Sequence, residues 1–261
     1  METVFTAGRE FEVYDLSQRL SNRTTAFEPN PHRIEYVHGS LGVERSERRW
    51  GLGAEYWPDG QAMNTEVVTL ATHSGTHVDA PIHYGPPKGA PITIDGVPLR
   101  WCIGDGVRLD MRHKKAGESI HRADVEAELK RLQYSLKPYD IVLVMTGTDR
   151  RFEEPGYDQM HPGLRRDATE FLVDSGVRLI GIDAWGLDRP FDVMVREARG
   201  GNKDQLWESH VLGRTKPYCQ IEKLCNLDAI PVSYGFTVVA LPISLEGASA
   251  GWARVVAIVW K

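Results

Sequence analysis

Apolar residues recur along this chain with the periods of helices and strands. Over residues 122–136, Val125, Leu129 and Leu132 fall on one face with Glu and Lys opposite, which predicts an amphipathic helix. A second helix is predicted where the sequence HPGL at residues 161–164 opens an apolar-periodic stretch that Gly176 closes. The chain therefore contains at least two helices that can pack one face against a core.

Short apolar runs predict strands between and around these helices. Residues 139–146 (YDIVLVMT) and 177–183 (VRLIGID) are apolar and rich in β-branched side chains, as buried strands are. Two strand–helix alternations within a strand-rich chain indicate a mixed α/β domain. The other predicted strands are residues 11–16, residues 66–71, and a closing antiparallel pair at 237–244 and 254–260.

The first sixty residues are weakly periodic and rich in Arg, Glu, Pro and Gly. Apart from residues 11–16, we expect long loops with aromatic anchors there, and loops of that length are usually functional or packed against a neighbour. No stretch has the composition of a linker. We therefore predict a single domain over residues 1–261, with a loop-rich segment at 1–60 and a core at 61–261.

The composition mainly excludes certain classes of protein. The 261 residues are 41% hydrophobic and 26% charged, and the formal net charge is −5, without a basic tract that would favour nucleic acid. No apolar stretch approaches the roughly 18–20 residues that span a bilayer, and the N-terminal sequence lacks the pattern of a signal peptide. Three cysteines without CxxC spacing predict free, buried thiols. These features favour a cytoplasmic protein that binds neither membrane nor nucleic acid.

The side chains that could bind a metal ion or act in catalysis are concentrated in residues 71–83, ATHSGTHVDAPIH. On a straight strand His73 and His77 point to the same side but lie about 13 Å apart, too far to share one ion. The chain must therefore bend, and Gly75 can adopt the dihedral angles that a bend requires. Pro81 then turns the chain so that His83 returns toward the others.

Imidazoles and a carboxylate together suit a divalent metal ion such as Zn²⁺, Mn²⁺ or Fe²⁺. A single histidine is more often an exposed loop residue, but that reading poorly explains three histidines with Asp79, a Gly and a Pro in this order. So few protein ligands leave a position for a reactive water, which indicates an enzyme.

Residues 73–83 resemble the HxGTHxDxPxH signature of the metal-dependent cyclase family, which includes bacterial kynurenine formamidase, isatin hydrolase and trans-dienelactone hydrolase. Further blocks also resemble that family, so the resemblance extends from about residue 13 to residue 259. These blocks are VYDLS at 13–17, VLVMTG at 142–147, HPGL at 161–164, LIGID at 179–183 and ARVVA at 253–257.

The resemblance implies a swivelling β/β/α fold with a mixed sheet, in homodimers or homotetramers that exchange N-terminal segments. It implies that His73, His77 and Asp79 are metal ligands and that His83 is a proton shuttle. His210 and Glu222, twelve residues apart as in the kynurenine formamidases, would complete a second metal position.

The number of ions stays open. Glu222 either ligates a second ion or acts as a catalytic base beside one ion, and the expected cofactor is Zn or Mn. Without the resemblance, His210 reads as a surface residue, and Glu222 lies in a segment, IEKL, that reads as helical.

Residues 183–188 follow a predicted strand end, where site residues are often found. Trp185 is a candidate substrate contact, and Gly186 stands where the family often has a serine, which leaves the substrate open. Asp183 and Asp188 are expected to cap or turn the chain. Trp57 is a second candidate substrate contact, although tryptophans such as Trp57, Trp101 and Trp207 are more often core or interface residues.

Together these features predict a metal-dependent hydrolase that cleaves an amide or ester of a small carbonyl substrate, such as a cyclic amide, formamide or lactone. One alternative is a polyketide-type cyclase that uses the same metal site. Another is a metal-binding protein without catalysis. A serine hydrolase is disfavoured because Ser244 and Ser249 lack the context of a nucleophile elbow.

Overall fold

The computed structural model describes residues 2–6, 8–24, 27–85 and 92–261. Contacts divide the chain into two compact units, Met1–Leu20 with Thr72–Lys261, and Ser21–Ala71. Within the described part, none of the helices has the length and apolarity that crossing a membrane requires.

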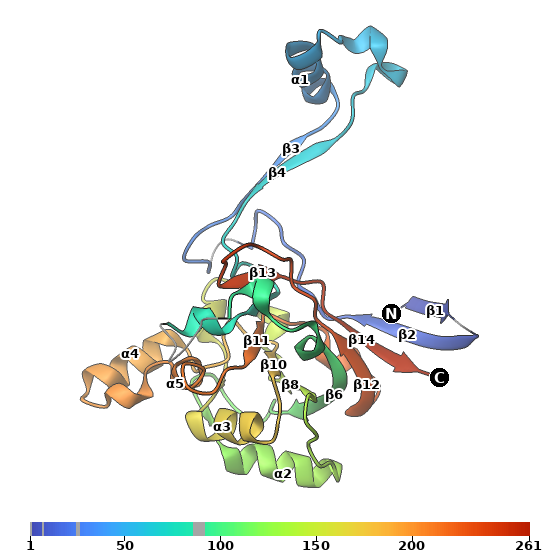
Figure 1. Ribbon diagram of the computed structural model, residues 1–261. Coiled ribbons are helices and arrows are strands. Elements are labelled where there is room, and N and C mark those ends of the chain that lie inside the picture. Colours follow the sequence, from blue (N-terminus) through green and yellow to red (C-terminus); the bar gives the residue numbers. More distant parts are fainter. Residues whose placement is uncertain (1, 7, 25–26, 86–91) are drawn as a thin grey trace. The chain divides into compact units, whose positions relative to one another are not determined.

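The larger unit is an α/β domain built on a ten-stranded mixed sheet (Figure 1). A central block of four parallel strands is flanked on both sides by antiparallel strands. The strand order is β1 (Glu2–Thr6), β2 (Arg9–Asp15), β14 (Val256–Trp260), β12 (Tyr234–Val239), β6 (Ile103–Asp110), β8 (Ile141–Met145), β10 (Leu179–Ile182), β11 (Cys219–Glu222), β5 (His77–Asp79) and β13 (Ala250–Trp252).

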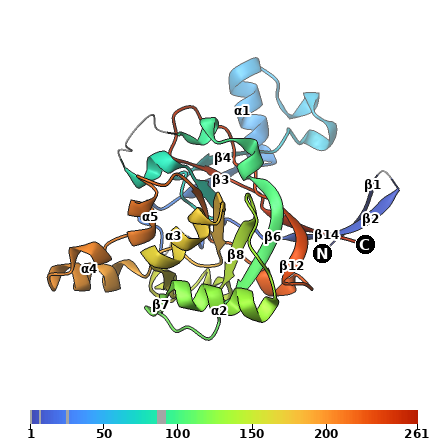
Figure 2. The same ribbon diagram turned by 60° about the horizontal axis from the view of Figure 1, so that its bottom comes forward.

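The two innermost strands, β8 and β10, lie between two covered faces of the sheet, and their sequences IVLVM and LIGI contain no polar side chain. Every residue of β8 and β10 is buried, as expected for parallel strands between two layers. Helices α2 (Arg122–Leu132) and α3 (Arg166–Asp174) cover one face (Figure 2). Leu172 of α3 is fully buried there, a burial that stabilises the fold by about 1.5–3 kcal/mol.

The remaining short elements lie around this core. They are α4 (Phe191–Arg199), α5 (Glu208–Leu212) and the two-stranded sheet of β7 (Ser119–Ile120) and β9 (Gly163–Leu164). Cys102, Cys219 and Cys225 are free and buried, as predicted.

The smaller unit contains an antiparallel pair and a helix. The pair is β3 (Arg33–Val37) with β4 (Thr65–Thr69), and the helix is α1 (Ser40–Trp50). The sequence prediction of long loops over residues 17–60 is wrong here. The α1 sequence, SLGVERSERRW, is rich in Arg and Glu and has few apolar residues, so the apolar pattern did not reveal the helix.

Most strand predictions are confirmed, including the antiparallel pairing of β12 with β14. Two helix boundaries differ from the predictions. The first helix ends at Leu132, because Gln133 has a left-handed backbone conformation. The second begins at Arg166 and not at residue 161, because Gly163 and Leu164 pair with β7 as strand β9.

Candidate metal centre

The histidine-rich segment enters the sheet through a bend at Gly75, whose φ is +62°. After this bend, His77–Asp79 form β5 between β11 and β13. The register of β5 with β11 sets Glu222 opposite His77. The bend predicted at Gly75 is therefore present, and it allows His73 and His77 to approach the same carboxylate.

A short helical turn, Pro81–Tyr84, follows β5 and brings His83 back. The ring centroids of His73 and His83 lie 4.1 Å apart, and those of His83 and His210 lie 5.4 Å apart. The return predicted after Pro81 is thus observed.

Asp79 lies at the middle of this cluster and is fully buried. Its Oδ1 lies 2.8 Å from Nδ1 of His73 and 3.2 Å from Nε2 of His77. Yet neither Asp79 oxygen, nor Nε2 of His77, makes a hydrogen bond of acceptable geometry. Buried polar atoms are rarely left without partners, so these atoms fit a bound cation.

The charge state of Asp79 also favours a bound cation. Burial alone would raise the pKa of Asp79, but the neighbouring histidines His83, His77 and His73 hold this pKa well below its usual range. An ionised carboxylate is what a divalent metal requires.

Glu222 reaches the cluster from the end of β11. Its Oε2 lies 3.5 Å from Nε2 of His77, and its Oε1 lies 3.8 Å from Nε2 of His210. Burial, together with the charge of Asp79, raises the pKa of Glu222. The helical reading of IEKL is wrong, because Cys219–Glu222 pair with β10 and β5 as a strand.

Two overlapping ligand sets emerge, and Asp79 belongs to both. One is His73, Asp79 and His83, and the other is His77, Asp79 and Glu222, each with ligand atoms within 4.8 Å of one another. Nitrogen and carboxylate donors of this kind suit Zn²⁺ or Mn²⁺. The arrangement is compatible with one ion or with two ions that share Asp79.

His210 is oriented by a residue whose role the sequence did not reveal. Oδ2 of Asp188 lies 2.5 Å from Nδ1 of His210, and Asp188 also accepts the backbone N–H groups of Ser209 and His210. Burial would lower the pKa of His210, but the hydrogen bond and charge of Asp188 raise it to about 9. Asp188 caps the chain as expected and, in addition, directs Nε2 of His210 toward Glu222.

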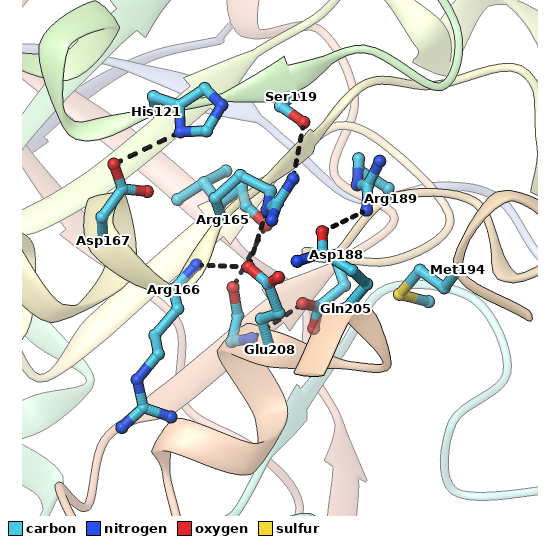
Figure 3. A network of polar contacts seen from close by, with 12 residues as sticks. Ser119, His121, Arg165, Arg166, Asp167, Asp188, Arg189, Met194, Gln205 and Glu208 are labelled. Carbon is cyan, nitrogen blue, oxygen red and sulfur yellow. Dashed lines mark hydrogen bonds and ion pairs between the residues drawn. The ribbon is translucent and has the colours of Figure 1, made fainter. Parts of the chain in front are cut away.

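Helix α5, which carries His210, is fixed by the buried carboxylate of Glu208 (Figure 3). Its Oε2 accepts a hydrogen bond from Nε of Arg165 at 2.7 Å and one from the backbone N–H of Arg166 at 3.0 Å. The position of α5 is therefore set by the start of α3.

The candidate substrate contacts are in different surroundings. Trp185 is half-buried, and its indole N–H has no partner in the described structure. Nζ of Lys223 lies 5.7 Å from the Trp185 ring and donates to the carbonyl of His73 at 2.8 Å. A Cβ on Gly186 would lie 3.5 Å from Oε1 of Glu222, so this position adjoins the cluster.

Trp57 belongs to the smaller unit, where its indole N–H donates to Oγ of Ser46 at 3.2 Å. Its role as a substrate contact stays a prediction. Asp183 accepts hydrogen bonds from Thr146 and from the backbone N–H of Gly147, which confirms its role in shaping the turn after β8.

Comparisons with known proteins agree with this architecture. The family model described as "Putative cyclase" matches residues 14–189, more than half of the chain. A kynurenine formamidase of Paracidovorax citrulli is 29% identical over 197 residues, which are 74% of this chain and 79% of that protein.

Another kynurenine formamidase, from Bacillus cereus, is 28% identical over 131 residues, which are 50% of this chain and 56% of that protein. The chain thus spans little more than half the length of that relative. A crystal structure of an isatin hydrolase bound to the product analogue thioisatinate has a TM-score of 0.76 at 21% identity. The match covers 96% of this chain and 93% of that one, and it shows that the fold is shared.

Proposed function

The chain belongs to the cyclase family, and from this premise we propose that it is a metal-dependent hydrolase of an amide or ester bond. The observation that carries the proposal is Asp79, a fully buried carboxylate with three histidines nearby and no hydrogen bond of acceptable geometry. The family relatives named kynurenine formamidase and the fold shared with isatin hydrolase favour a formamide, cyclic amide or lactone as substrate.

His73, His77 and Asp79 would hold the ion. A divalent ion bound there would lower the pKa of a water toward about 7 and polarise a carbonyl oxygen. The protein contributes a buried and preorganised set of donors, which do not have to be desolvated again when substrate arrives.

His83 is the residue we assign to proton transfer. Burial lowers its pKa to about 4, so its imidazole is neutral at pH 7 and can accept a proton. Its side chain is only partly buried, in contact with the His73 ring. It can therefore take a proton from the attacking water and return it to the leaving nitrogen or oxygen.

Glu222 and His210 have one of two roles. Either they ligate a second ion, with Asp79 shared, or Glu222 is a base beside a single ion. Glu222→Gln separates these roles. Loss of one of two bound ions would identify a ligand, whereas unchanged metal content with a lower kcat would identify a base.

Ring closure of a polyketide-type substrate is the second candidate function. It is favoured by Gly186, which adjoins Glu222 and leaves room there that a larger residue would fill. In that case the same residues would hold an ion whose positive charge would stabilise an enolate during ring closure, and no bond would be hydrolysed.

The test combines metal analysis of the purified protein with assays on N-formylkynurenine, isatin and a dienelactone. Hydrolysis of at least one substrate, lost after chelation and restored by Zn²⁺ or Mn²⁺, is expected. Full metal occupancy without turnover of any of them would contradict the hydrolase proposal and favour the cyclase or a non-catalytic metal protein. Light scattering on the same sample tests the proposed homodimer or homotetramer.

A further inference from the structure

We propose that Lys223 limits the metal centre to one divalent ion. This inference rests on the proposed function and decides between the two arrangements that it leaves open, in which one or two ions use the ligand sets that share Asp79. Lys223 directly follows Glu222 at the end of β11, and only 2% of its surface is exposed. A buried ammonium group next to metal ligands changes how much positive charge those ligands can hold.

Lys223 reaches the histidine cluster because its backbone leaves the strand conformation. Successive side chains of a regular strand point to opposite faces of the sheet, so Lys223 would otherwise point away from the cluster that Glu222 enters. Its φ is +58°, in the left-handed region that residues other than glycine rarely adopt. Nζ donates a hydrogen bond to the carbonyl oxygen of His73 at 2.8 Å. Two neighbours along the chain therefore act at the same cluster.

Two further contacts hold Lys223 in place. Its Nζ lies 5.7 Å from the centre of the Trp185 ring, within the range of a cation–π interaction. Its carbonyl oxygen accepts a hydrogen bond from Oγ1 of Thr76 at 2.6 Å. Lys223 thus contacts the chain on both sides of the bend at Gly75, and its positive charge has a fixed position.

The charge of Lys223 acts on a residue of each ligand set. Burial lowers the pKa of His73, the charge and hydrogen bond of Asp79 raise it above its usual value, and Lys223 opposes that rise. Burial and the charge of Asp79 raise the pKa of Glu222, and Lys223 opposes this rise as well. The ammonium group is therefore close enough to both sets to repel a cation in either of them.

The balance of charge in the cluster favours one ion over two. Asp79 and Glu222 are the only carboxylates of the two ligand sets, and together they neutralise one divalent ion. Asp188, the carboxylate beside His210, is already paired with that histidine. A second ion would have to bind next to the first ion and next to the ammonium group of Lys223. Repulsion between charges in a buried site is much stronger than in water, so the second ion is disfavoured.

Removing the ammonium group should therefore allow a second ion to bind. Equilibrium titration of metal-free protein with Mn²⁺ measures the number and affinity of the ions, and EPR detects magnetic coupling between two Mn²⁺ ions that share a carboxylate. The wild type should bind one ion and show no coupling. Lys223→Met should bind a second ion about 10- to 100-fold more tightly than the wild type does and show coupling.

Three further variants provide the controls. Lys223→Gln keeps a hydrogen-bond donor without the charge and should behave as Lys223→Met does, which keeps the test decisive if one of the two variants fails to fold. Lys223→Arg keeps the charge and should bind one ion. Lys216→Met removes an equal charge from an exposed pair with Asp174 and should also bind one ion.

A merely structural role of Lys223 predicts a different result. If the hydrogen bond to His73 only positions that ligand, Lys223→Met should bind the first ion more weakly and gain no second ion, which would overturn the proposal. Two tightly bound ions in the wild type would overturn it as well, even if that protein hydrolyses an amide or ester. One ion in the wild type and two in Lys223→Met would support it even if no substrate is hydrolysed.

Discussion

Oδ2 of Asp188 lies 2.5 Å from Nδ1 of His210, and the same oxygen accepts the backbone N–H of that histidine. The carboxylate holds a proton on Nδ1, so Nε2 is the nitrogen that gives up its proton when a metal ion binds. In Asp188→Asn an amide NH₂ would replace one acceptor and would favour the opposite tautomer. We expect metal affinity at the His210 position to fall about 10- to 100-fold, measured by competition with a chelator.

A double-mutant cycle provides the control for this prediction. If Asp188 acts through His210, the double variant Asp188→Asn with His210→Ala should bind metal no more weakly than His210→Ala alone. Additive losses of affinity would show that Asp188 contributes by another route, such as the general stability of α5.

Two substitutions distinguish a metal ligand in the cluster from the residue that transfers a proton. Asp79→Asn should abolish both metal binding and activity, because the shared and fully buried carboxylate is removed from both ligand sets. His83→Ala should keep the metal content but lower kcat by about 10²- to 10⁴-fold, the usual contribution of a proton-transfer group. Metal analysis with kinetics on the same preparations measures both effects. Loss of metal in His83→Ala would instead identify His83 as a ligand beside His73.

The sequence predicted those parts of the fold and site that depend on local pattern. The apolar runs of β8 and β10 indicated buried strands, and the spacing from His73 to His83 required the bend that Gly75 makes. Both features are contained in fewer than a dozen consecutive residues, so neighbours along the chain decide them.

Other features could not be predicted because distant partners decide them. The sequence at Glu222 reads as helical, and only pairing with β10 and β5 makes the residues of β11 a strand. Asp188 and His210 are 22 residues apart, and no local pattern connects them. Trp207, directly before α5, has a left-handed backbone conformation with a φ of 46°, which favours Gly or Asn. Backbone propensity alone would therefore have placed a different residue there.

The bend at Gly75 should be sensitive to a single methyl group. A Cβ at this position would lie 2.7 Å from Cδ2 and 2.9 Å from Cγ of Leu20, in addition to the strain of a positive φ. We expect Gly75→Ala to destabilise the fold by about 1–3 kcal/mol and to lower the metal content, because His73 and His77 would separate. Urea unfolding and metal analysis measure the two effects.

Gly247→Ala is the matched control. Its φ is +69°, close to that of Gly75, but an added Cβ meets no atom within 4 Å. It therefore reports the backbone strain alone. Equal destabilisation of the two variants, with unchanged metal content in both, would show that the Gly75 bend does not organise the cluster.

Asp183 should make stability depend on pH. Burial raises its pKa to about 7, although the hydrogen bonds from Thr146 and Gly147 favour the charged form. The unfolded chain releases this proton near pH 4. Between about pH 4 and pH 7 the native state therefore binds more protons than the unfolded state, and the free energy of unfolding decreases as pH rises.

Asp183→Asn cannot titrate and should lack this part of the decrease. Unfolding by urea at pH 5, 6, 7 and 8 in the presence of EDTA gives the free energy for both proteins, and titrations common to both cancel in the difference. The wild type should lose stability relative to Asp183→Asn by on the order of 1 kcal/mol per pH unit up to pH 7 and no further above it. Parallel curves from pH 5 to pH 7 would show that the hydrogen bonds from Thr146 and Gly147 outweigh burial and that Asp183 is ionised throughout.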